Sequence, residues 1–151
     1  MRPVKNPYEE LPGYFCFGCS PANTYGLRLS FTEDGDYVCS HWQPEHQHQG
    51  YLNILHGGIQ ATLLDEISSW VVMVKLKTNG VTAKLDIRYK KAVSVEKGPV
   101  SIRARLLEMK RNIAVIEAEL FDAEGNLCAC SKSEFFTYPQ EKARKELFLG
   151  K

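Results

Sequence analysis

The sequence predicts an α+β domain in which an antiparallel sheet of about six strands wraps around one long central helix. A long segment near the middle of the chain is apolar on nearly every side of a helix, as buried helices are. Alternating apolar and polar residues, typical of strands, occur before and after that segment, with turn signals between them. Nothing else in the chain could cover a buried helix, so the sheet is expected to enclose it.

Length and composition indicate one ordinary globular domain. A chain of residues 1–151 is long enough to form a single hydrophobic core. Its content of 44% hydrophobic and 25% charged residues is usual for a globular protein. The chain has 19 Lys and Arg residues against 18 Asp and Glu, so its net charge is close to zero. Net charge therefore does not favour nucleic acid or an anionic membrane as a partner. No apolar run suits a signal peptide or a membrane span, and we expect a cytoplasmic protein.

The N-terminal arm, residues 1–25, is expected to be irregular because prolines and a glycine interrupt it: Pro3, Pro7, Pro12 and Gly13. Cys16 and Cys19 form a Cys-x-x-Cys, for which zinc would need two further ligands. Other cysteines and histidines could in principle supply them, but none forms a second spaced pair, so no metal or cofactor is expected. The pair is interpreted as buried thiols, and all five cysteines as free.

A hairpin is predicted ahead of the helix. Apolar and polar residues alternate over residues 27–31, and a second strand is predicted over residues 37–42. The turn signal at residues 33–36 joins the two strands. A loop over residues 43–55 then leads into the helix, which is expected to stop at Asn79-Gly80.

The remainder of the chain is predicted to be a meander of strands at residues 81–89, 99–108, 112–121 and 127–137. In the first of them, strict alternation places Val81 and Ala83 on the core-facing side and Thr82 on the opposite side. Residues 139–151 are a charged tail, expected to be a short helix or disordered.

The helix begins with His56-Gly57-Gly58 and carries a strip of small or polar residues on one face: Gly58, Thr62, Asp65 and Ser69. A carboxylate in such a place is costly unless it is paired or useful. The ordered set of glycines and aspartate resembles the hotdog-fold acyl-CoA thioesterases, in the PaaI-like branch of the 4HBT superfamily, over most of the chain. This resemblance implies a hotdog fold and an acyl-CoA substrate.

Thioester hydrolysis needs an activated oxygen nucleophile and hydrogen-bond donors at the carbonyl oxygen. Amides at a helix start lack acceptors within the helix, so Gly58 is the expected oxyanion donor, with Gly57 beside it in contact with substrate. Asp65 is expected to act as general base or as nucleophile, and both roles stay open. The helix rise separates Gly58 and Asp65 by about 10 Å. One site is therefore expected to combine two subunits of a homodimer or of a dimer of dimers.

Further site residues follow from the resemblance. Thr82 matches a serine or threonine that positions the water or the carboxylate, and an ordinary strand threonine is the alternative. His56 is expected to support the loop or to help bind the carbonyl, and it ranks below the glycine and the aspartate. Gln49 is chosen for the polar partner that relatives carry upstream, and Asn53, closer to the helix, for substrate contact.

The phosphates of coenzyme A require Lys or Arg. Lys90 and Lys91, after the strand over residues 81–89, are the candidates, although relatives often show Arg-Pro there. Glu66 is interpreted as a member of a structural pair rather than as a chemical group. The alternative function is a non-catalytic domain that binds acyl-CoA as a sensor, and the intact Asp65 and glycine pair argue against it.

Overall fold

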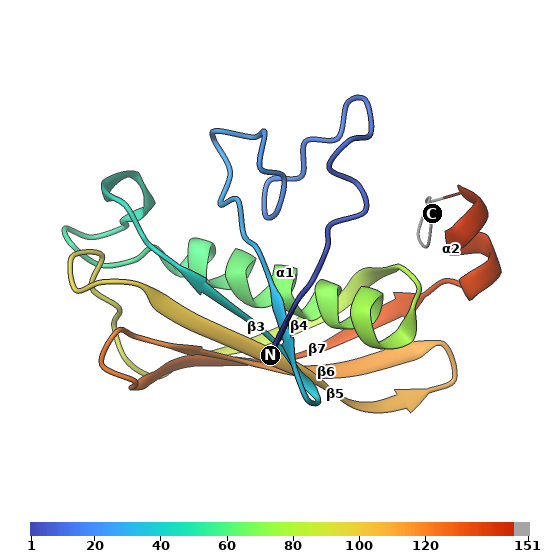
Figure 1. Cartoon of the computed structure of the whole chain (residues 1–151). Helices are drawn as coiled ribbons and strands as arrows, with labels where there is room; N and C mark the ends of the chain where they lie inside the picture. Colours follow the sequence, from blue (N-terminus) through green and yellow to red (C-terminus); the bar gives the residue numbers. More distant parts are fainter. Residues whose placement is uncertain (147–151) are drawn as a thin grey trace.

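The computed structural model describes residues 1–146, which form one antiparallel sheet with a long helix across it (Figure 1). The sheet has seven strands in the order β1-β2-β3-β5-β6-β7-β4. The strands are β1 (Arg2–Pro3), β2 (Thr32–Asp34), β3 (Tyr37–Trp42), β4 (Gly80–Tyr89), β5 (Val100–Lys110), β6 (Ile113–Phe121) and β7 (Leu127–Thr137). The helices are α1 (Gly57–Leu76), the short 3-10 helix η1 (His46–His48) and α2 (Gln140–Glu146). The predicted α+β architecture is confirmed.

Helix α1 is buried along most of its length, and fully buried side chains occur throughout it: Leu63, Leu64, Ile67, Val71 and Val72. They join strand residues in one hydrophobic core. Trp70 stacks on Phe31 from the segment before β2, with 4.9 Å between the ring centroids. The helix is thus covered from more than one side, which explains why it is apolar nearly all round. Among the described residues, no helix has the length and apolar character needed to cross a bilayer.

The predicted strand at residues 27–31 is wrong. Its backbone N–H groups donate to Phe17 O (2.8 Å) and Gly18 O (2.9 Å) of the arm, so the segment pairs with the arm instead of the sheet. Arg28 has a φ of 52°, a left-handed conformation that interrupts any strand. The first hairpin strand is instead β2, which takes up part of the predicted turn. The alternating burial was nevertheless correct, because the apolar residues of the segment are in the core.

The predicted four-strand meander is wrong in its first member. Strands β5, β6 and β7 pair in sequence, but β4 pairs with β7 at the edge of the sheet, and β5 pairs with β3. Figure 1 shows that α1 lies over one face of the sheet, and in the chain it connects β3 to β4. Strand β4 therefore lies at the far edge of the sheet from the β2–β3 hairpin, with β5, β6 and β7 between them.

Strand β4 contains a β-bulge that local alternation could not reveal. Thr82 pairs with Phe135, the next register pair is Lys84 with Glu134, and Ala83 is left over. The extra residue reverses the side-chain alternation at that point. Thr82 therefore shares a side with buried Phe135, while Val81, predicted to face the core, is 50% exposed. The predicted orientations of these two side chains are corrected accordingly.

The N-terminal arm lies over α1 on the side away from the sheet (Figure 1). It is irregular except for β1, which pairs with β2. At the other end of the chain, α2 occupies the first part of the predicted charged tail. The remainder of that tail, residues 147–151, lies outside the described residues.

Candidate active site

Helix α1 starts with one amide for which the described part of the chain offers no acceptor. His56 is the N-cap, and its Nδ1 accepts the Gly58 N–H at 2.8 Å. The His56 carbonyl accepts the N–H groups of Ile59 (3.0 Å) and Gln60 (3.1 Å). Among the residues that the structure describes, the Gly57 N–H has no acceptor. The sequence favoured Gly58 as the oxyanion donor, whereas the structure leaves Gly57 as the unengaged amide and shows His56 holding that of Gly58.

Tyr89 contacts the helix start, which the sequence did not indicate. Its hydroxyl donates to the Gly57 carbonyl at 2.7 Å, so the end of β4 is fixed to the first turn of α1. Lys90 and Lys91 follow directly and are exposed, and both backbone N–H groups donate to Cys128 O. Lys90 borders a groove with Arg88 and Glu117, and Lys91 borders another with Ser94 and Asp122. Neither candidate phosphate-binding lysine therefore borders the same groove as His56 and Gly57.

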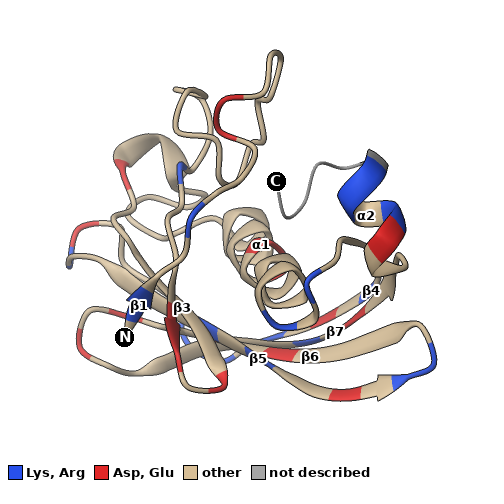
Figure 2. Cartoon of the chain, turned by 45° about the vertical axis from the view of Figure 1, so that its right-hand side comes forward, with Lys and Arg blue, Asp and Glu red and all other residues tan. Residues whose placement is uncertain are grey.

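Asp65 and Thr82 form a pair further along the helix. The Thr82 hydroxyl donates to Asp65 Oδ1 at 2.8 Å. Asp65 is half-buried and Thr82 is exposed, so solvent can reach the pair from the edge of the sheet. The charged residues within α1 are this aspartate, the neighbouring Glu66 and Lys75 near its C-terminal end (Figure 2). The bulge in β4 places the threonine within reach of the carboxylate.

Gln49 and Asn53 belong to the loop before the helix. Gln49 Oε1 accepts the Asn53 N–H at 2.7 Å, and Gln49 Nε2 approaches the ring of His46. The carbonyl of Asn53 accepts the Val95 N–H at 3.0 Å. Both predicted site residues thus shape the loop, because the Gln49 carboxamide is already engaged within it.

A groove of about 390 Å³ lies at the helix start and is lined by Gly50, Tyr51, Ile54, Leu55, His56 and Gly57. Tyr51 is 88% exposed and Leu52 is 79% exposed, so a large apolar surface borders this groove. Such a surface suits an apolar ligand or a protein partner.

The predicted site residues fall into two groups within one chain. His56, Gly57 and Gly58 lie at the helix start, and Asp65 with Thr82 lies further along. The helix rise separates the groups by about 10 Å, so one small carbonyl cannot contact both in the same chain. The first group offers hydrogen-bond donation, and the second offers a positioned carboxylate.

A family model for the thioesterase superfamily matches residues 52–129, more than half of the chain. A candidate esterase of Saccharolobus solfataricus is 28% identical over 95 residues, which cover 62% of this chain and 62% of that protein. A candidate esterase of Haemophilus influenzae is 26% identical over 115 residues, covering 76% of this chain and 83% of that protein. The chain thus spans less than two thirds of the archaeal relative.

Solved structures have the same fold. A thioesterase superfamily protein superimposes with a TM-score of 0.73 at 21% identity, covering 80% of this chain and 62% of the other. A hypothetical thioesterase of Streptococcus pneumoniae with coenzyme A gives 0.67 at 24% identity, covering 74% and 87%. A Streptococcus mutans protein bound to acetyl-CoA gives 0.68 at 19% identity, covering 85% and 96%. With the family match over more than half of its length, this chain belongs to the thioesterase superfamily.

Proposed function

We propose that the protein is an acyl-CoA thioesterase that hydrolyses a thioester to a free acid and coenzyme A. The observation that carries this proposal is the carboxylate of Asp65, which is half-buried and held by the Thr82 hydroxyl at 2.8 Å. It lies on a helix whose first amide has no acceptor among residues 1–146. Superfamily membership supports the reaction class. The two streptococcal structures with coenzyme A or acetyl-CoA support the choice of substrate class. The proposed placement in the PaaI-like branch rests on the ordered set of His56, the glycine pair and Asp65.

In the proposed reaction, the helix start stabilises negative charge on the thioester oxygen. The Gly57 amide is the unengaged donor, and the Gly58 amide joins it when His56 releases its hydrogen bond. Asp65 either takes a proton from the attacking water or attacks the carbonyl itself and forms an anhydride that water opens. In both routes the thiol of coenzyme A leaves, and Thr82 keeps the carboxylate oriented.

A second copy of this chain completes each site in our proposal. Strand β4 is ten residues long and forms one edge of the sheet, and its outer side has no strand partner among the described residues. Unpaired edges favour pairing with another strand. Pairing at this edge also covers Val81, which is 50% exposed, and brings a partner toward Asp65. The assembly is a homodimer or a dimer of dimers, with the helix start of one copy facing Asp65 of the other.

Coenzyme A binds, in this proposal, near the helix start. Lys90 and Lys91 supply positive charge for its phosphates next to Tyr89, whose hydroxyl holds the Gly57 carbonyl. The groove of about 390 Å³ at the helix start accommodates the part of the acyl-CoA that carries the thioester. The phosphates would then lie beyond the end of β4, and the thioester would lie at the helix start.

Free-thiol release from short, long and phenylacetyl-type acyl-CoAs tests the proposed function. The proposal predicts saturable turnover of at least one member by the wild-type protein. Saturable binding of acyl-CoA without thiol release, with the dimer present, would favour the non-catalytic binding domain and overturn the proposal.

Replacing Thr82 with valine should lower kcat by about 10- to 100-fold with little change in KM. The valine keeps the shape but removes the hydrogen bond to Asp65, and a bond to a charged group contributes roughly 1.5–3 kcal/mol. Thr82→Ser retains the hydroxyl and should restore most of the rate. An unchanged kcat in Thr82→Val would show that this threonine is an ordinary strand residue.

A further inference from the structure

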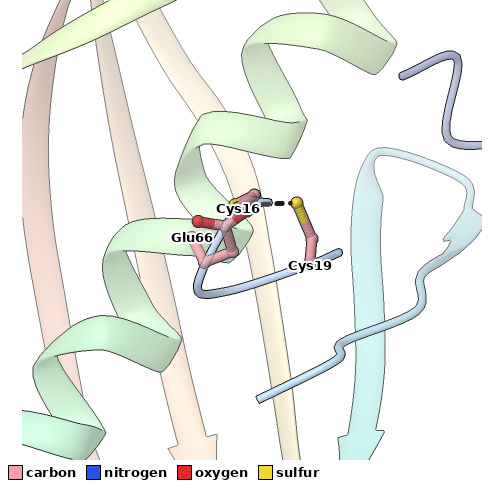
Figure 3. A group of neighbouring side chains, drawn as sticks. All are labelled: Cys16, Cys19 and Glu66. Atoms are coloured by element: carbon pink, nitrogen blue, oxygen red, sulfur yellow. Dashed lines mark hydrogen bonds between the residues drawn. The ribbon is translucent and has the colours of Figure 1, made fainter. Parts of the chain in front are cut away.

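Two thiols of the arm and one carboxylate of α1 meet outside the proposed catalytic groups. The Cys19 thiol donates to Cys16 Sγ at 3.1 Å, and the Cys16 thiol donates to Glu66 Oε1 at 3.6 Å (Figure 3). One ligand atom from each residue lies within 4.8 Å of the others. Cys16 and Glu66 are 50 residues apart in the chain, so the spacing of the cysteines could not reveal this third group. The proposed thioesterase reaction uses none of the three.

The turn that carries the cysteines is fixed in place. The Ser20 N–H donates to Cys16 O at 3.1 Å, and the carbonyls of Phe17 and Gly18 accept N–H groups from residues 27–29. A Cβ added to Gly26 would lie 2.2 Å from Phe17 O, so the two segments approach as closely as only glycine allows. The thiols are therefore held on rigid backbone and are positioned before any ligand arrives.

The carboxylate of Glu66 is held against this turn. Its Oε1 accepts the Trp70 Nε1–H at 3.1 Å. A Cβ on Gly18 would lie 2.5 Å from both Cδ and Oε2 of Glu66, so glycine leaves the room that the carboxylate occupies. The Cys19 thiol lowers the pKa of Cys16 most, and the backbone amides of Cys19 and Gly18 lower it further. Such outer contacts orient ligands and stabilise thiolates in metal sites.

Two thiolates with their sulfurs this close repel each other, and a positive charge between them removes that cost. The hydrogen bond from Cys19 lowers the pKa of Cys16 to about 7. The same bond and burial raise the pKa of Cys19 above its usual value. The Tyr14 hydroxyl, 2.9 Å from Cys19 Sγ, is placed to donate to that sulfur when it is deprotonated. A divalent cation would allow both sulfurs to be thiolates and would displace their protons.

We propose that Cys16, Cys19 and Glu66 bind a zinc ion, with a solvent molecule as the fourth ligand. Two thiolates select a soft or borderline metal, and the carboxylate favours Zn²⁺ over Cu⁺. Tetrahedral Zn²⁺ with Zn–S bonds of about 2.3 Å places its sulfurs about 3.7 Å apart, so the thiols at 3.1 Å need to separate only slightly. The ion joins the arm to α1 at the residue after Asp65. It thereby adds a structural link beyond the proposed hydrolysis.

Zinc binding by the full-length chain tests this site without reference to activity. The reduced protein, stripped of metal, is titrated with ZnCl₂ against a chromophoric chelator. We expect one equivalent to be retained, and Co²⁺ in its place should give thiolate-to-cobalt charge-transfer absorption. Cys16→Ser and Cys19→Ser should each abolish retention of that equivalent, and Glu66→Gln should weaken it by about tenfold or more.

Cys39→Ser is the matched control, because Cys39 is another partly buried thiol outside the cluster. It should bind zinc as the wild type does. Circular dichroism establishes whether each variant is folded. The cobalt spectrum is recorded on the wild type, so it tests the site even if a variant does not fold. The proposal is overturned if folded, reduced wild type retains no zinc, if either cysteine variant keeps the equivalent, or if bound cobalt shows no thiolate absorption.

Discussion

Replacing Asp65 with asparagine should lower thioester hydrolysis by about a thousandfold, within the range of about 10² to 10⁴ that a positioned general base contributes. Asparagine has nearly the same shape, and its side-chain oxygen can still accept the Thr82 hydroxyl. It can neither take a proton from water nor attack a carbonyl. Single-turnover release of coenzyme A, measured beside acyl-CoA binding and thermal unfolding, checks the result, and only the release step should change.

Asp86→Asn is the matched control for this experiment. Asp86 is an exposed carboxylate on β4, opposite Lys132 of β7, and it has no place in the proposed chemistry. Its rate should equal that of the wild type. An Asp65→Asn protein that hydrolyses acyl-CoA at the wild-type rate would remove this carboxylate from the mechanism.

Replacing Gly57 with proline should lower kcat by about 10² to 10³, the usual loss for one oxyanion donor. Proline removes the one amide of the first turn that has no acceptor within the described chain. The fold should tolerate it, because proline suits the first position of a helix and His56 has the extended ψ of 133° that a residue before proline requires. The three atoms nearest to a Cβ at this position belong to Tyr89, at an ordinary 3.7 Å.

The stability of Gly57→Pro decides how its rate is interpreted. Its melting temperature should match or exceed that of the wild type, since proline restricts the unfolded chain. A lower kcat in a variant as stable as the wild type would show that the Gly57 amide stabilises the transition state. A full rate in the stable variant would exclude this amide and leave Gly58, released by His56, as the donor.

The periodicity of apolar residues was sufficient to predict the elements that bury one continuous surface. Strands β5, β6 and β7 and the buried helix α1 lie within a few residues of their predicted bounds, because each repeats its apolar pattern over many residues. Residues 27–31 show the same alternation but pair with the arm, since Arg28 adopts a left-handed conformation that no pattern of apolar residues encodes. The position of β4 at the sheet edge likewise depends on long-range pairing.

The site shows a similar division. The glycine pair after His56 marked the helix start, because caps and unshielded amides are local features. The Thr82 contact with Asp65 depends on one extra residue in β4, and a bulge shifts every alternation argument beyond it. Tyr89 on Gly57 is a contact between elements distant in sequence, so spacing alone could not show it.

The claim that two chains share each active site is tested most directly by a heterodimer of Asp65→Asn with Gly57→Pro, isolated through a different tag on each chain. If the helix start of one copy works with Asp65 of the other, one site of the pair is intact and the other carries both changes. The heterodimer should then recover about half of the wild-type activity per dimer. Activity no higher than that of the two parent variants would contradict the shared site.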